Sequence, residues 1–176
     1  ASWERTAPLN EKNIDAIQPA ILLHPDGRIQ ILCRSKQSQI MVSWSEDNGR
    51  HWSPLLPSGM PNPNSGLDAV SLKDGRHLLV YNHLKTGRNM LNVAVSSDGV
   101  NWEAAVVLEN DSKGTEYSYP AVIQTDDGLV HITYTWNRKL IKHVVLDPSL
   151  IDTKPFSDGN WPDNQALRKQ QASQEA

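Results

Sequence analysis

The sequence of 176 residues lacks the features that mark several common functional classes. It contains a single cysteine, Cys33, so an internal disulfide framework is excluded. The net charge is −3 and the basic residues are scattered, which does not favour binding to nucleic acid or to an anionic membrane. The densest basic group, Arg138, Lys139 and Lys142, is too small to form a binding patch. No apolar run approaches the roughly 18 residues that would indicate a membrane span.

Patterns for a metal or a cofactor are also missing. Four of the six histidines, His24, His51, His131 and His143, lack the close spacing of metal ligands. We therefore expect neither a metal nor a cofactor. Cys33 lies inside the apolar run 29–33 and is predicted to be a small core residue rather than a nucleophile.

The sequence does contain short apolar runs separated by turn-forming residues, including eleven prolines and ten glycines. This composition is typical of β structure with tight turns. Asp-Gly pairs at residues 26–27, 74–75 and 127–128 each separate two such runs. Asp-Gly between two β runs is a strong short-range signal for a hairpin, so three hairpins are predicted.

A longer phrase repeats along the chain. Residues 45–52 read Ser-x-Asp-x-Gly-x-x-Trp, and residues 96–102 repeat this pattern with one residue fewer. The tryptophans at its end, together with an early one, are Trp3, Trp52 and Trp102, spaced by 49 and 50 residues. Self-similarity at this period is typical of propellers and solenoids. We interpret each phrase as a structural turn, in which Gly allows a positive φ, Asp accepts amide hydrogen bonds and Trp packs beneath.

The repeats predict an all-β fold built from four-stranded antiparallel β-propeller blades. The expected units are a partial blade over residues 1–16 with an outer strand at 3–9, blades over 17–63 and 64–116, a partial blade over 117–150, and a polar, poorly ordered C-terminal tail over 151–176. Blades bury their faces against neighbouring blades. Two full and two partial blades cannot close a ring, so we expect a missing N-terminal half of the propeller to complete it.

Polar residues recur where a propeller would place its central pocket. Side chains near the start of each innermost strand, and in the loops entering it, line the central opening. The candidates at such positions are Gln18, Asn64, Asp68, Glu116, Tyr117 and Tyr119. Arg34 ends a second strand and Arg88 precedes a third strand, and Asn82 and His83 are further candidates for the lining of the pocket. Apolar strands with these residues at corresponding places predict a polar central pocket.

The repeated boxes, the Asp-Gly turns and the stretch Glu-Tyr-Ser-Tyr-Pro-Ala-Val-Ile-Gln at residues 116–124 resemble the sialidase (neuraminidase) superfamily. The similarity is greater to its bacterial sialidase-like group with BNR, or Asp-box, repeats. It covers residues 1 to about 150. The resemblance implies about half of a six-bladed sialidase-like propeller, namely its C-terminal half.

Two arginines match the family pattern for holding a sugar carboxylate. Arg34 follows Gln18 by 16 residues, and Arg88 precedes Ser96 of the second box by eight residues. The resemblance implies that Arg34 and Arg88 bind the carboxylate, because planar guanidinium groups bind carboxylates in bidentate fashion. Gln18 occupies the position where the family carries a glutamate, and an amide cannot act as a base.

The resemblance also implies a tyrosine nucleophile. The family's nucleophile lies in a Tyr-Ser phrase that Tyr117 and Ser118 match, whereas Tyr119 is the better equivalent of Gln18 by strand register. Tyr117 and Tyr119 are two residues apart and would face one side of an extended strand, so both remain candidates. Glu116 is the residue that could substitute for the missing glutamate.

The function implied by the resemblance is retaining hydrolysis of a glycoside that bears a carboxylate, a sialic or uronic acid, through a tyrosyl-enzyme intermediate. A propeller that binds acidic glycans without hydrolysing them is the first alternative. The second is a uronate polysaccharide lyase, which needs a base near the proton next to the carboxylate. His83 and Tyr119 are the candidates for that base.

Overall fold

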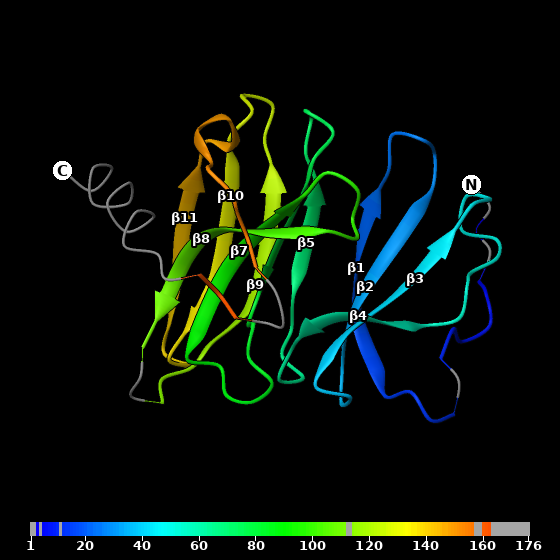
Figure 1. Cartoon of the computed structure of the whole chain (residues 1–176), viewed down its shortest axis with the longest axis horizontal. Helices are drawn as coiled ribbons and strands as arrows, with labels where there is room; N and C mark the ends of the chain where they lie inside the picture. Colours follow the sequence, from blue (N-terminus) through cyan, green and yellow to red (C-terminus); the bar gives the residue numbers. More distant parts are fainter. Residues whose placement is uncertain (1–2, 4, 11, 112–113, 157–159, 163–176) are drawn as a thin grey trace.

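The computed structural model describes residues 3, 5–10, 12–111, 114–156 and 160–162. Within these residues the chain forms three antiparallel sheets and one short 3-10 helix, η1 (Pro148–Leu150) (Figure 1). No helix in this described part is long and apolar enough to cross a membrane. The fold is therefore all-β, as the sequence predicted.

The sheets follow one another along the chain. The first sheet has the order β1-β2-β3-β4, with β1 (Ala16–Leu23), β2 (Ile29–Ser35), β3 (Gln39–Ser45) and β4 (Leu56–Pro61). The second sheet has the order β12-β8-β7-β6-β5, with β5 (Asp68–Ser71), β6 (His77–Tyr81), β7 (Met90–Ser96), β8 (Trp102–Asn110) and β12 (Lys154–Pro155). The third sheet has the order β11-β10-β9, with β9 (Tyr117–Gln124), β10 (Val130–Trp136) and β11 (Leu140–Leu146).

The second sheet lies between the other two, and β6 shows this arrangement residue by residue. All five residues of β6 are buried. Leu78 and Val80 belong to the apolar cluster shared with the third sheet, whereas Leu79 and Tyr81 belong to the cluster shared with the first sheet. Each of these side chains packs against a neighbouring sheet, so truncation of either leucine to alanine should cost about 2–5 kcal/mol.

The inner strands β1, β5 and β9 are neighbours in space, β5 lying between the other two. Their arrows all point in the same direction (upward in Figure 1). The first residues of all three strands therefore gather at one edge of the molecule. The three Asp-Gly hairpin turns lie at the opposite edge.

The repeated boxes have the structural role that their residues predicted. In the first box, Gly49 has φ +83° and donates its amide to Ser45 Oγ at 2.8 Å. Asp47 Oδ1 accepts the His51 amide at 2.8 Å, and Trp52 Nε1 donates to the Gly49 carbonyl at 3.0 Å. The second box repeats these bonds with Ser96, Asp98, Gly99 and Trp102. The prediction that the boxes are turns with a packed tryptophan is confirmed.

The start of the chain differs from its prediction. Residues 3 and 5–9 form no strand, and Trp3 is 82% exposed. Leu9 and Ile14 instead pack against the outer face of the first sheet, together with Ile31, Cys33 and neighbouring core residues. The expected outer strand is wrong because no neighbouring strand pairs with this segment in the described chain. Cys33 is buried in this cluster, as predicted.

The segment after residue 150 also differs from the expected polar tail. β12 pairs antiparallel with β8, and Phe156 and Trp161 pack against the cluster between the first two sheets. Residues 151–156 and 160–162 thus continue the packed structure, because two aromatic side chains find apolar surface there. The rest of the expected tail, 157–159 and 163–176, lies outside the described residues.

The outer faces of the two end sheets carry exposed apolar side chains. On the first sheet these include Ile21 and Leu23, and on the third sheet Ile123, Ile141 and Val145. The inner faces of the same sheets are buried against the second sheet. Within the described residues, each end sheet therefore keeps exposed apolar side chains on its outer face, although Leu9 and Ile14 cover part of that face on the first sheet.

Candidate functional site

Gln18 and Tyr119 occupy equivalent positions in two inner strands, at the edge where these strands begin. The pairing of β1 with β2 shifts register between Ile17 and Pro19, which leaves Gln18 out of the ladder. The pairing of β10 with β9 shifts likewise, and Tyr119 is left out. Both residues have positive φ, 51° for Gln18 and 53° for Tyr119. Such a backbone costs of order 1–3 kcal/mol in a residue other than glycine, and such strain clusters at functional sites.

Arg34, near the end of β2, contacts both the inner strand β1 and the loop that precedes the next inner strand, β5. Its Nη1 donates to Gln18 Oε1 at 2.7 Å, and its Nε donates to Asn64 Oδ1 at 2.9 Å. Both acceptors are neutral amide oxygens, which hold the guanidinium in place without neutralising it. The positive charge of Arg34 remains available to an anionic ligand.

Arg88 lies in the loop before β7. It contacts the loop before β5, which Arg34 also contacts, from the other side. Its Nη2 donates to the Asn64 carbonyl at 3.3 Å, and its Nη1 donates to Glu116 Oε1 at 3.2 Å. The guanidinium carbon is 5.5 Å from the centre of the Tyr119 ring. Asn64, with φ 55°, therefore contacts both arginines and sets the distance between them. The structure brings together Gln18, Arg34, Asn64, Arg88, Glu116 and Tyr119.

The Tyr119 side chain is the exposed phenol of this group, with half of the residue's surface accessible. Hydrogen bonding to the Arg88 and Arg34 guanidinium groups lowers the pKa of Tyr119 below its usual value. Gly66 packs against the ring, since a Cβ at that position would lie 3.1 Å from Tyr119 Cδ1. The phenol is thus held between two cations and a residue without a side chain.

Glu116 receives three hydrogen bonds and is not placed as a base. Arg88 and Ser118 donate to its Oε1, and Arg138 Nε donates to its Oε2 at 2.7 Å. Burial would raise the pKa of Glu116, but the bonds from Arg138 and Ser118 outweigh it, and the pKa is lowered. A carboxylate held in its ionised form by two guanidinium groups is a weak proton acceptor, so Glu116 orients Arg88.

Tyr117 lies apart from this group. It is 4% exposed and packs in the cluster between the second and third sheets, with its ring 6.3 Å from that of Trp136. The expectation that Tyr117 and Tyr119 face one side of the strand is wrong. The irregularity at Tyr119, with its positive φ, interrupts the alternation of an extended strand.

Asp68 and Asn82 take part in packing rather than in the arginine group. Asp68 Oδ2 accepts the Val122 amide at 2.8 Å, which ties β5 to β9, and burial raises the pKa of Asp68. Asn82 Nδ2 donates to the carbonyls of Met90 and Tyr117. Both side chains join one sheet element to the next.

His83 is buried as well. It hydrogen-bonds Asn92 and lies beside Trp161, with ring centres 5.1 Å apart. Burial lowers the pKa of His83 to about 4. This histidine is neutral at ordinary pH and is enclosed by core groups.

Arg138 and Ser118 are the contacts that the sequence did not reveal. Arg138 lies in the turn after β10, and it belongs to the basic group of Arg138, Lys139 and Lys142, which is too small to predict a binding patch. The sequence carries one signal for this turn, the dipeptide Asn137-Arg138 between two apolar runs. It takes the place of Asn-Gly, which is the usual pair in a two-residue hairpin turn. Ser118 lies between the two candidate tyrosines, and its spacing alone carries no signal.

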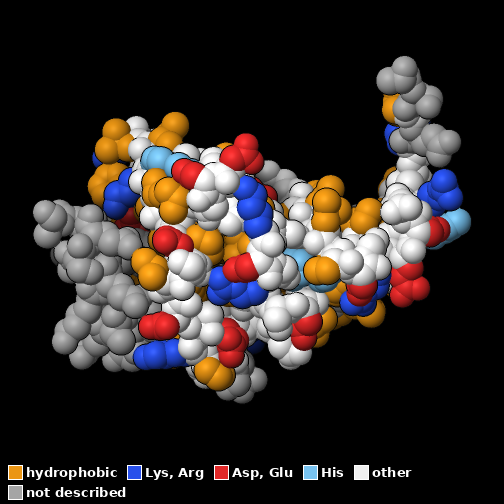
Figure 2. All heavy atoms as spheres, turned by 90° about the horizontal axis from the view of Figure 1, so that it is seen from above, with side chains coloured by type: hydrophobic (Ala, Val, Ile, Leu, Met, Phe, Trp, Pro, Cys, Tyr) orange, Lys and Arg blue, Asp and Glu red, His pale blue; other side chains and the backbone are white. Residues whose placement is uncertain are grey.

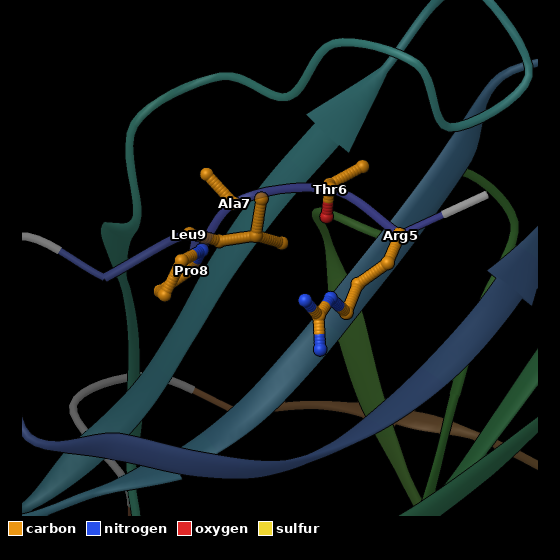
Figure 3. Close-up of a pocket in the computed structure, with 5 residues that line it drawn as sticks. All are labelled: Arg5, Thr6, Ala7, Pro8 and Leu9. Carbon is orange, nitrogen blue, oxygen red and sulfur yellow. The ribbon is translucent and has the colours of Figure 1, made fainter.

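Other hollows on the surface of the described residues lie away from the arginine group. One is lined by Arg5, Thr6, Ala7, Pro8 and Leu9 (Figure 3). Its single charged side chain, Arg5, has no carboxylate beside it in that lining. At the edge opposite the arginine group, acidic and basic side chains are interspersed with apolar ones (Figure 2). Ion pairs at the hairpin turns, such as Arg28–Asp26 and Arg76–Asp74, account for this mixture.

Comparisons with known proteins agree with this architecture. A family profile described as a BNR repeat-like domain matches residues 1–132. No curated protein sequence matches the chain significantly.

Solved structures with the same fold include an intramolecular trans-sialidase from Ruminococcus gnavus, with 19% identity and a TM-score of 0.67 over 85% of this chain and 36% of that one. The NanB sialidase from Streptococcus pneumoniae has 17% identity and a TM-score of 0.66 over 83% of this chain and 25% of that one. A further structure described as a sialidase has 26% identity and a TM-score of 0.62 over 76% of this chain and 13% of that one. The chain thus spans about a third or less of the lengths of these proteins.

Proposed function

The chain belongs to the BNR repeat-like domain family, and we propose that its arginine group binds the carboxylate of an acidic sugar for glycoside hydrolysis. The observation that carries the proposal is Tyr119, an exposed phenol held between Arg34 and Arg88 on a strained backbone. The sugar would be a sialic or uronic acid. The resemblance in fold to sialidases supports this substrate class.

The charges around the two arginines favour an anionic ligand. Arg34 has neutral partners, and Arg88 shares its one carboxylate partner, Glu116, with Arg138. Guanidinium groups bind carboxylates through charge-assisted, often bidentate, hydrogen bonds. The Ruminococcus gnavus trans-sialidase was solved with oseltamivir carboxylate, which is consistent with carboxylate recognition by this fold.

Tyr119 would act as the nucleophile. Its phenolate oxygen would attack the anomeric carbon, the bond to the leaving oxygen would break, and water would then cleave the glycosyl-tyrosine with overall retention. A phenol suits a substrate with its own carboxylate, since a carboxylate nucleophile would be repelled by it. Tyr117 is buried in the core and is not proposed for this step.

The guanidinium groups of Arg34 and Arg88 would replace part of the effect of the missing base, which is to favour the ionised form of Tyr119. Gln18 cannot accept the phenol proton, and Glu116 is held ionised by its cationic partners. The lowered pKa of Tyr119 increases the fraction of phenolate at a given pH. The acid that protonates the leaving group would come from further blades of the propeller.

Those further blades would also cover the apolar faces of the two end sheets. Exposed Ile21, Leu23, Ile123 and Ile141 are residues that blades bury against one another. The matched sialidases are much longer than this chain. We therefore propose that the N-terminal half of a propeller packs on these faces.

A second candidate function is binding of acidic glycans without turnover. The specific observation in its favour is Gln18, an amide at 2.7 Å from Arg34 where the resemblance implies a glutamate. The lyase alternative has less support, because His83 is buried beside Trp161 and Tyr119 would be its sole candidate base.

The test is turnover of a fluorogenic sialoside and a fluorogenic glucuronide by the complete propeller protein that contains this chain and by four variants of it: Tyr119→Phe, Tyr117→Phe, Arg88→Ala and Arg28→Ala. Arg28 pairs with Asp26 at the opposite edge and serves as the matched arginine control. We expect activity to fall at least about 100-fold in Tyr119→Phe, because the covalent step is lost, and to fall in Arg88→Ala but not in Arg28→Ala. Retention at the anomeric carbon is read by proton NMR of the first-formed product.

Binding of the free sugars by calorimetry completes the test. If sugar binding weakens in Arg88→Ala and neither wild type nor any variant turns over a substrate, the function is glycan binding and not hydrolysis. Activity that survives in Tyr119→Phe but is lost in a folded Tyr117→Phe would overturn the assignment of the nucleophile.

A further inference from the structure

The turn between β10 and β11 adds two more residues with positive φ beside the site. Asn137 and Arg138 have φ 51° and 52°, and the Lys139 amide donates to the Trp136 carbonyl at 3.0 Å. In a turn with two positive φ angles, asparagine followed by glycine is the usual pair. Asparagine tolerates this conformation, but arginine at the second position gives up stability that glycine would keep.

Three hydrogen bonds fasten this turn to Glu116. The Asn137 amide donates to the Glu116 carbonyl at 2.7 Å, and the Glu116 amide donates to Asn137 Oδ1 at 3.1 Å. Arg138 Nε donates to the Glu116 carboxylate at 2.7 Å. The Arg138 guanidinium is therefore held on the same carboxylate that orients Arg88.

The charge at the site exceeds what one carboxylate needs. While Tyr119 is a neutral phenol, Arg34, Arg88 and Arg138 supply three positive charges, and Glu116 supplies one negative charge. A bound sugar carboxylate would leave one positive charge over. Arg138 is 74% exposed, so most of its guanidinium faces solvent at the rim while its Nε is engaged.

We propose that Arg138 binds a second anionic group of the substrate, so that the preferred ligand is an acidic glycan with two anionic groups close together. The inference rests on the proposed carboxylate-binding function of Arg34 and Arg88. The second group is a sulfate ester or the carboxylate of an adjacent sugar, both of which accept paired N–H donors.

Calorimetric titration at low salt tests this inference with three probes. Methyl glucuronide has one anionic group, its sulfate ester adds a sulfate, and a disaccharide of two glucuronic acids adds a second carboxylate. The protein variants are Arg138→Gly, Arg88→Ala and Lys139→Ala. Arg138→Gly removes the guanidinium and suits the positive φ, so its thermal midpoint should be unchanged or higher. Lys139→Ala removes a cation from the same turn and is the matched control.

We expect Arg138→Gly to weaken binding of at least one two-charge probe roughly 10-fold, the effect of losing a charge-assisted contact, and to leave methyl glucuronide within about twofold. The affected probe identifies the second group. Lys139→Ala should leave all three affinities within about twofold, and Arg88→Ala should weaken all three.

Three other results would overturn the inference in distinguishable ways. Unchanged affinities in Arg138→Gly, with all of them reduced in Arg88→Ala, would refute the second contact and leave the proposed function standing. An equal loss for one-charge and two-charge probes in Arg138→Gly would mean that Arg138 only positions Arg88 through Glu116. If wild type binds none of the probes and no sialic acid, the proposed function fails and takes the inference with it.

Discussion

Replacement of the glycine in each Asp box should affect stability to very different extents. Gly49 and Gly99 occupy the same place in the two boxes and both have positive φ, +83° and +73°. A Cβ on Gly49 would meet only Trp52 Cζ2, at 3.8 Å. A Cβ on Gly99 would overlap Gln30 Oε1 and lie 2.8 Å from His24 Cε1. Among the described residues, Gly99 thus lies against the neighbouring sheet, whereas Gly49 lies against the tryptophan of its own box.

The magnitudes follow from these contacts. Both alanine variants bear the cost of a positive φ in a residue with a Cβ, about 1–2 kcal/mol. In Gly99→Ala, Gln30 must also move, which breaks its 2.8 Å hydrogen bond to the Gly99 carbonyl and its 3.1 Å bond with His24. These buried bonds contribute about 1 kcal/mol each. We expect losses of about 3–4 kcal/mol for Gly99→Ala and about 1–2 kcal/mol for Gly49→Ala.

Urea unfolding monitored by tryptophan fluorescence measures the difference, and thermal unfolding checks it. At roughly 2–4 °C per kcal/mol for a domain of this size, the two thermal midpoints should differ by about 5 °C. Equal losses in the two variants would show that the contact between Gly99 and Gln30 does not join the sheets. That result would refute the account of the second box as an element of inter-sheet packing.

Three further predictions concern pH and the site. Burial lowers the pKa of His77 and of His83 from 6.5 to about 4. The unfolded chain therefore binds protons that the folded chain does not, and stability should be complete above about pH 6.5 and fall steadily between pH 6.5 and 4. A thermal midpoint that stays constant over this range, followed by circular dichroism, would contradict these pKa values. Gly66→Ala should displace the Tyr119 ring, and so lower sugar affinity or turnover with little change in thermal midpoint. A variant equal to wild type in sugar affinity and in turnover would show that the ring moves freely. Gln18→Glu should raise hydrolysis of the fluorogenic substrate by about 10-fold or more, because it supplies a carboxylate base; no increase in a folded variant that still binds the sugar would mean that a base at this position is not the missing element.

Residues close together in the chain carried most of the fold prediction. The Asp boxes form through hydrogen bonds between residues two to four positions apart, such as Gly49 to Ser45 and Trp52 to Gly49. Residue type and spacing therefore determine them almost completely. Apolar runs between such turns then make antiparallel sheets the expected outcome, and the period of about 50 residues makes them repeats.

The strand at 3–9 and the tail after 150 could not be predicted in the same way. A strand needs a partner, and residues 3–9 have none in the described chain. The structure of residues 151–156 and 160–162 depends on the edge of β8 and on apolar surface that Phe156 and Trp161 cover. Neither the lack of a partner strand nor the surface that the tail covers can be read from the residues of these segments alone.

The sequence by itself determined the repeat, the hairpins, the boxes and the candidate arginines, because each is a matter of residue type at a short or regular spacing. The tertiary structure decided which candidates meet. The irregularity at Tyr119 places its side chain away from that of Tyr117. The hydrogen bond of Arg138 to Glu116 adds to the site a cation that the sequence did not predict there. These outcomes depend on contacts between neighbouring strands and between residues 22 to 31 positions apart, such as Arg138 with Glu116 and Arg88 with Tyr119. Such contacts exist only once the strands have paired and the sheets have packed.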